Sequence, residues 1–195
     1  MILRAAPIPA VAALMLLVAG CTTGPGVIHH TRISTSYSIQ DLSYVAGRGD
    51  GQLWTEIVGN PFGSPQPAFE AAVISYMQGS HFGPRVDFTT TPSDEAATAY
   101  RVRMIFNGPA ASNGSVVCGG SPGALAPSPE NGTVRLLAAF CRGSRPLTFL
   151  SAAMENASGV EDPAFRSFIR RVTSRLFPPQ NPERRDGDDR CTPPC

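Results

Sequence analysis

Lysine is absent from this chain, and all 16 of its basic residues are arginine. The absence excludes every arrangement that needs a lysine, including the phosphate-binding P-loop, a Schiff base and a Ser-x-x-Lys nucleophile. The arginines are balanced by 15 acidic residues, so the formal net charge is only +1. Because nucleic-acid-binding domains need a strongly basic surface, this balance argues against a nucleic-acid partner.

Histidine is also scarce, with three residues in the chain. His29 and His30 are adjacent in a polar N-terminal segment, and His81 is the one histidine within the predicted domain. Nucleophilic catalysis by a Ser–His or Cys–His pair needs a histidine that a carboxylate orients. No such motif surrounds His81, so we predict no catalytic residue, no metal site and no cofactor.

Long apolar runs are limited to the start of the chain. Arg4 is followed by an uncharged stretch, residues 5–19, whose core is rich in Leu, Val and Ala. A basic start, a short apolar segment and small residues before a cleavage site are typical of a secretory signal peptide. The stretch is too short to span a membrane, which takes about 20 apolar residues. We predict that residues 1–20 are a cleaved signal peptide.

The signal-like segment ends in Val18-Ala19-Gly20-Cys21, which resembles the lipobox of bacterial lipoproteins. The resemblance implies that Cys21 is diacylated on its sulfur, becomes the first residue after cleavage and is acylated on its new amino group. Several acyl chains anchor a protein far more firmly than one. Thr22, a residue other than Asp, then implies an outer-membrane anchor that faces the periplasm. An ordinary signal peptide with a chance cysteine near its cleavage site is the alternative.

The cysteines beyond Cys21 number four, which are Cys118, Cys141, Cys191 and Cys195. An even number in an exported protein predicts disulfides, and four cysteines allow three pairings. We favour Cys118–Cys141, at the ends of two predicted strands, together with Cys191–Cys195 in the C-terminal tail. The second pair resembles the Cys-x-x-Cys motif of thioredoxins, but three residues separate its cysteines and no helix follows. A structural disulfide is therefore favoured over a redox or metal site.

Composition divides the chain into four regions. Residues 1–20 form the signal peptide, and residues 21–37 are polar, without periodicity, and are predicted to be a lipidated tether with a reach of about 50 Å. Residues 38–177 form a single α+β domain. Residues 178–195 form a proline-rich, charged tail without core-forming residues.

Within the domain, apolar periodicity predicts seven strands and two helices. One helix is bounded by Ser64 and Gly79, and the other begins at the cap Asp162. The short connections predict an antiparallel sheet with two amphipathic helices packed on one face. The predicted strands cover residues 39–46, 53–58, 86–88, 100–106, 115–118, 133–141 and 147–152.

The second helix carries four arginines, which are Arg166, Arg170, Arg171 and Arg175. In one interpretation their aliphatic stems cover the margin of the core while their charged ends stay in water. In the other they bind the phosphates of anionic lipid, which the planar guanidinium group suits.

The small size and the strand–helix order resemble small lipoprotein domains of bacterial envelopes. Our first hypothesis is a non-enzymatic accessory domain, held at the membrane by acyl chains on Cys21, that binds an envelope protein or lipid in the periplasm. The alternative is a hydrolase of an envelope polymer that uses carboxylates such as Asp87, Asp94 or Glu95. Such chemistry needs two carboxyls at a defined separation in space.

Overall fold

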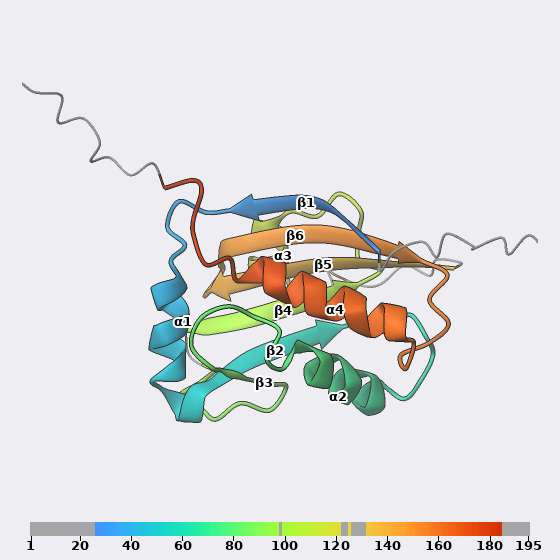
Figure 1. Ribbon diagram of the computed structural model, residues 1–195, viewed down its shortest axis with the longest axis horizontal. Helices are drawn as coiled ribbons and strands as arrows, with labels where there is room; N and C mark the ends of the chain where they lie inside the picture. The colour runs from blue at the N-terminus through green and yellow to red at the C-terminus, as the bar shows by residue number, and fades with distance from the viewer. Residues whose placement is uncertain (1–25, 98, 122–124, 126–131, 185–195) are drawn as a thin grey trace, which may run out of the picture.

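The computed structural model describes residues 26–97, 99–121, 125 and 132–184. Its centre is a six-stranded sheet with the order β1-β6-β5-β4-β2-β3 (Figure 1). The strands are β1 (Val27–Ile33), β2 (Gln52–Val58), β3 (Asp87–Thr89), β4 (Tyr100–Phe106), β5 (Thr133–Arg142) and β6 (Arg145–Glu155). The predicted antiparallel pairing holds for β1, β6, β5 and β4, whereas β2 runs parallel to both β3 and β4. The sheet is therefore mixed.

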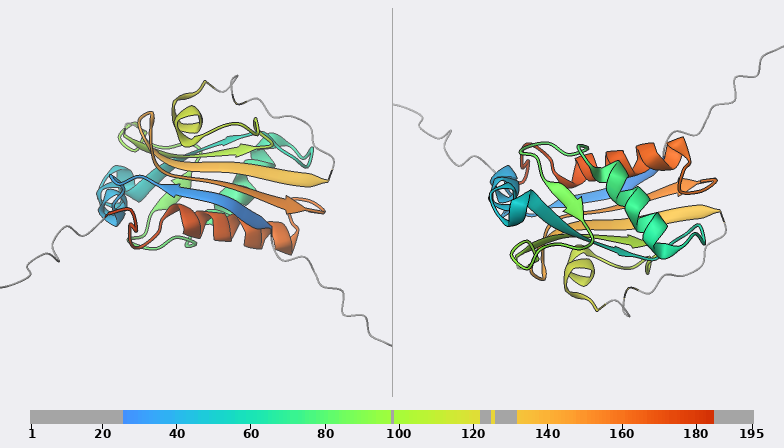
Figure 2. Two further views of the ribbon diagram at one scale, coloured as in Figure 1. Left: turned by 90° about the horizontal axis from the view of Figure 1, so that it is seen from above. Right: turned by 90° about the horizontal axis from the view of Figure 1, so that it is seen from below.

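Helices lie on both faces of the sheet. The helices are α1 (Ile39–Ala46), α2 (Gln66–Met77), α3 (Gly114–Gly119) and α4 (Pro163–Leu176), with a short 3₁₀ turn, η1 (Gly49–Gly51). As predicted, α2 and α4 share one face, whereas α3 lies on the opposite face (Figure 2). The α+β class is confirmed.

The main core fills the space between the sheet and the helices α2 and α4. Phe69 of α2 meets Phe106 of β4 with ring centroids 4.9 Å apart, and Phe165 of α4 lies 6.2 Å from each of them. Each fully buried phenylalanine contributes about 1.5–3 kcal/mol to folding. The apolar face of α4 is buried as its spacing predicts, at Phe165, Phe168, Ile169, Val172 and Leu176.

Residues 39–46 form the helix α1 and not the predicted strand. Ser38 begins the helix with a capping box, in which its hydroxyl accepts from the Gln40 amide and the Asp41 carboxylate accepts from the Ser38 amide. Leu42 and Val45 are buried on one side, which is a helical spacing. The antiparallel sheet predicted from the sequence therefore loses the strand expected before residues 53–58.

Residues 115–118, also predicted as a strand, lie in α3. The Asn113 side chain accepts from the amides of Ser115 and Val116 at 3.0 and 3.1 Å, and so caps the helix. A Cβ atom added to Gly114 would lie 3.0 Å from side-chain atoms of Phe149 and Pro146. The helix therefore packs closely on β6.

The folded unit is longer at both ends than the predicted domain. Val27–Ile33, placed in the predicted tether, is β1 and pairs with β6. Its side chains are mostly exposed. A strand that is exposed at the edge of a sheet has no apolar periodicity, so the sequence did not indicate a strand here. At the other end the Tyr37 hydroxyl donates to the Pro178 carbonyl at 2.7 Å. The Asn181 amide group donates to the carbonyls of Ser34 and Tyr37, so the first residues of the predicted tail pack on the chain that follows β1.

The cap of α4 makes a testable contribution to stability. Hydrogen bonds from the amides of Ser158 and Ala164 lower the pKa of the Asp162 carboxyl. Asp162→Ala should reduce the free energy of unfolding by about 1 kcal/mol at neutral pH. Because the folded-state pKa is lowered, the contribution is present above the unfolded-state pKa and is lost as pH falls through the folded value.

Urea denaturation at neutral and strongly acidic pH measures this difference. Asp94→Ala, which changes an exposed carboxylate, is the control and should leave stability unchanged at both pH values. A deficit in Asp162→Ala that persists at acidic pH would contradict the assignment.

Candidate functional site

A groove of about 900 Å³ lies beside β1. One wall comes from the second half of β1 and the residues that follow it, residues 30 and 32–36. The second comes from residues 112–115 at the start of α3, and the third from residues 145–149 at the start of β6. Three segments that are far apart in the sequence therefore meet at one end of the sheet.

The charged side chains that line this groove are basic. They are Arg32 of β1 and Arg145 of β6, with His30 beside them, and no Asp or Glu is among the described residues that line it. Serine and threonine hydroxyls add further polar groups, from Ser34, Thr35, Ser36, Ser112 and Ser115. Guanidinium groups form strong, charge-assisted hydrogen bonds with carboxylates and phosphates. The groove therefore favours an anionic ligand.

The groove also runs along a sheet edge. Among the described strands, β1 pairs with β6 alone, so its outer side presents backbone donors and acceptors. A register shift between Ile28 and His30 marks a bulge, a feature that is frequent at sheet edges. An exposed edge is a template for an added strand, so this arrangement suits an extended peptide.

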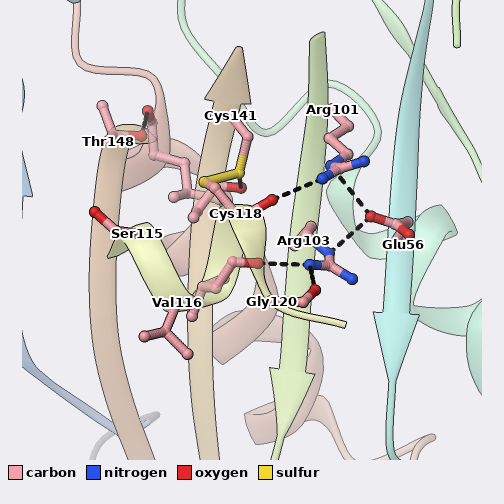
Figure 3. Close-up of a disulfide and its surroundings, with 12 residues drawn as sticks. Glu56, Arg101, Arg103, Ser115, Val116, Cys118, Gly120, Cys141 and Thr148 are labelled. Carbon is pink, nitrogen blue, oxygen red and sulfur yellow. Dashed lines mark hydrogen bonds and ion pairs between the residues drawn. A yellow bond between two sulfur atoms is a disulfide. The ribbon is translucent and has the colours of Figure 1, made fainter. Parts of the chain in front are cut away.

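A disulfide fixes α3, which forms one wall of the groove, to the sheet (Figure 3). It joins Cys118 of α3 to Cys141 of β5, with Cα atoms 5.7 Å apart. This pair was predicted from the sequence and is confirmed. The other predicted cysteine sites, Cys191, Cys195 and the lipidation site Cys21, lie outside the described residues.

The carboxyl end of α3 rests on two arginines of β4. Arg103 donates from Nη1 to the carbonyl of Val117 at 2.7 Å and to that of Gly120 at 2.8 Å. Arg101 donates from Nη2 to the carbonyl of Cys118 at 2.6 Å. The last carbonyls of a helix have no partner within it, so these guanidinium groups satisfy them.

Glu56 of β2 forms ion pairs with both arginines (Figure 3). Its Oε2 lies 2.7 Å from Nε of Arg103 and 3.3 Å from Nε of Arg101. The Arg103 side chain is only 3% exposed. Burial lowers its pKa and the charge of Glu56 opposes that shift, but an arginine stays protonated in either case. This buried cluster was not predicted from the sequence, although the alternation of Arg101 and Arg103 in a strand places both on one face.

The four arginines singled out in α4 lie on the opposite side of the molecule from α3. Arg166 lies over the ring of Tyr76, 5.0 Å from its centroid, and Arg170 donates to the Ser80 hydroxyl at 3.3 Å. Arg171 donates to the carbonyl of Gly26, and Arg175 is exposed. None of the four lines the groove.

His81 packs within the fold through its ring contacts and a hydrogen bond. Its Nε2 lies 3.0 Å from the carbonyl oxygen of Pro84, and its ring packs edge-on against Phe88 at 5.3 Å. These two contacts stabilise the connection between α2 and β3.

The carboxylates considered for hydrolysis lie in and after β3, at the other edge of the sheet. Asp87, Asp94 and Glu95 are exposed. Asp87 is 4.0 Å from Arg85, and Glu95 forms an exposed ion pair with Arg48 at 3.7 Å. None of the three lines the groove.

Comparisons of the chain with models of known families, with curated proteins and with solved structures find no match. Within the described ranges, no three His, Cys, Asp or Glu side chains lie close enough together to hold a metal ion. No helix in the part of the chain that the structure describes has the length and apolar character needed to cross a bilayer.

The buried cluster under α3 predicts a large loss of stability in Arg103→Met. The variant leaves the carbonyls of Val117 and Gly120 without their donor and Glu56 without its closest partner. Removing one member of a buried charge network costs about 3–5 kcal/mol, and denaturant unfolding measures it. Arg48→Met, which breaks an exposed pair, is the matched control and should cost less than about 1 kcal/mol. Equal effects of the two substitutions would show that the cluster does not hold α3.

Proposed function

We propose that the chain is a bacterial envelope lipoprotein, anchored in the outer membrane by acyl chains on Cys21, and that its domain binds a partner in the periplasm without catalysing a reaction. The signal-like start and the lipobox-like Val18–Cys21 support the anchor. The start of β1 at Val27 limits the tether to the few residues after Cys21, with a reach of about 20 Å. The domain is then held close to the bilayer.

We infer that the groove beside β1 is the binding site, and that its partner is an acidic, extended segment of another envelope protein. The observation that carries this proposal is the lining, which combines Arg32, Arg145 and His30 with no carboxylate among the described residues. A free phosphate would use the same arginines, but the adjacent free edge of β1 favours a peptide.

Such a segment would bind in two ways at once. Its backbone would add to the outer edge of β1, since main-chain hydrogen bonds to a sheet edge supply affinity in this mode of recognition. Every second side chain of the added strand would point toward the groove. Carboxylates at those positions would bind Arg32 and Arg145, and hydrogen bonds to a charged group contribute about 1.5–3 kcal/mol each.

The anchor is tested by Cys21→Ala in cells. Membrane fractionation with a high-salt wash, which removes proteins held by charge alone, should find the parent protein in the membrane fraction and the variant in the soluble fraction, because no acyl chain remains. Mass spectrometry of the N-terminal peptide should show the acyl groups in the parent alone. A parent protein without acyl groups on Cys21 would contradict the proposed anchor.

The groove is tested by photo-crosslinking in cells. A benzoyl-phenylalanine at Ser115, an exposed lining residue, should crosslink to one acidic protein, which mass spectrometry identifies. The same group at Asp94, beyond β3, should not capture that protein.

Charge reversal then separates groove binding from general charge effects. Arg32→Glu with Arg145→Glu should reduce the Ser115 crosslink at least about 10-fold, because two charge-assisted contacts become repulsive. Arg48→Glu with Arg85→Glu changes the net charge equally at exposed positions away from the groove and should leave the crosslink intact. Equal loss in both double variants, or no loss in either, would overturn the assignment of the groove.

A further inference from the structure

The exposed surface of α4 is basic along its whole length. Arg166, Arg170 and Arg175 are exposed, Arg171 is half-buried, and the helix itself contains no acidic residue. At 100° per residue, Arg166 and Arg170 flank one side of the exposed crest, and Arg171 and Arg175 flank the other. Arginines on both flanks of a helix can reach one flat, negatively charged surface together.

A shallow hollow of about 360 Å³ lies between α4 and α2. Arg166 and Arg170 line it together with Ser75, Tyr76 and Gln78. The contact of Arg166 with the Tyr76 ring and the hydrogen bond of Arg170 to Ser80 hold both guanidinium groups at its rim. The Ser75, Tyr76 and Gln78 side chains donate to groups of the protein itself, so the two guanidinium groups are the donors that suit a phosphate.

The path of the N-terminal chain places this surface next to the anchor. Arg171 donates to the carbonyl of Gly26, and a Cβ atom on Gly26 would lie 2.6 Å from the Phe168 ring. The described chain therefore begins directly against α4. Five residue steps separate Gly26 from Cys21, which is about 17 Å at full extension.

We propose that the exposed face of α4, with the hollow it shares with α2, docks on the anionic lipid head groups of the membrane that holds Cys21. Lipid phosphates bind Arg166 and Arg170 in the hollow, while Arg175 contacts head groups on the other flank. The acidic residues nearest to α4 in sequence, Glu161 and Asp162, lie at its amino end. Neither lines the hollow, although Glu161 accepts from the hydroxyl of the lining residue Tyr76 at 3.3 Å. The orientation at the membrane rests on the proposed lipid anchor, whereas the affinity of this surface for anionic lipid does not.

Vesicle sedimentation tests the docking surface without the anchor. The full mature chain, residues 21–195, carries Cys21→Ser so that no acyl chain contributes. It should sediment with vesicles of equimolar phosphatidylcholine and phosphatidylglycerol and stay in solution with phosphatidylcholine alone. Arg166→Gln with Arg170→Gln should lower the partition coefficient roughly 30-fold, as expected for two arginines at an anionic surface.

Arg48→Gln with Arg85→Gln is the matched control, since it removes the same charge from exposed positions away from α4. It should leave vesicle binding close to that of the parent, and urea denaturation checks that both double variants are folded. Absence of binding to the anionic vesicles, or an equal loss in both double variants, would overturn the proposal. The last measurement is a titration with inorganic phosphate. Binding of phosphate without binding of vesicles would assign the hollow to a soluble anion and would overturn the proposed docking on lipid.

Failure of this proposal is distinguishable from failure of the lipid anchor. The anchor is measured in cells by acylation of Cys21, and the docking surface is measured on a chain that cannot be acylated. A protein that is acylated but does not bind anionic vesicles would retain the anchor and lose the docking surface.

Discussion

The contact between Arg103 and the end of α3 is the interaction on which the second face of the sheet depends. An isolated helix of six residues is far too short to be stable in water, and α3 has this length. It persists because its carbonyls accept from Arg103 and Arg101 and because Cys118 is bonded to Cys141. Glu56 in turn pairs with both arginines and offsets part of their charge. Without this support, the start of α3 would not form a fixed wall of the groove.

The elements that could be predicted are those with strong local patterns. The helix α4 combines the cap Asp162 with a long apolar face, β4 alternates apolar residues with Arg101 and Arg103, and the centres of β5 and β6 are rich in apolar residues. The two misassigned helices, α1 and α3, are short and contain residues that also suit a strand. In both cases a capping signal was present, at Ser38 with Asp41 and at Asn113. In a short helix the cap carries more information than the apolar periodicity.

The candidate site could not be predicted because its walls are remote in sequence. Arg32 and Arg145 reach one groove through the pairing of β1 with β6, and β1 has no apolar period that marks it as a strand. The parallel pairing of β2 with β4 was hidden for a similar reason, since α2 and β3 lie between them in the chain. A connection that contains a helix brings the chain back to the same end of the sheet. The prediction of a fully antiparallel sheet assumed short turns between strands, and this connection is not a short turn.

The early start of β1 changes what the anchor can do. A tether of about 15 residues would let the domain turn freely above the bilayer, whereas with the proposed anchor at Cys21 the short link to Gly26 would hold the α4 side near the surface. The layer with α3 lies on the other side of the sheet (Figure 2), so the groove is not covered when α4 docks on lipid. Under these proposals the two basic surfaces have separate roles, because the sheet between them would keep one at the membrane and leave the other open to a partner in the periplasm.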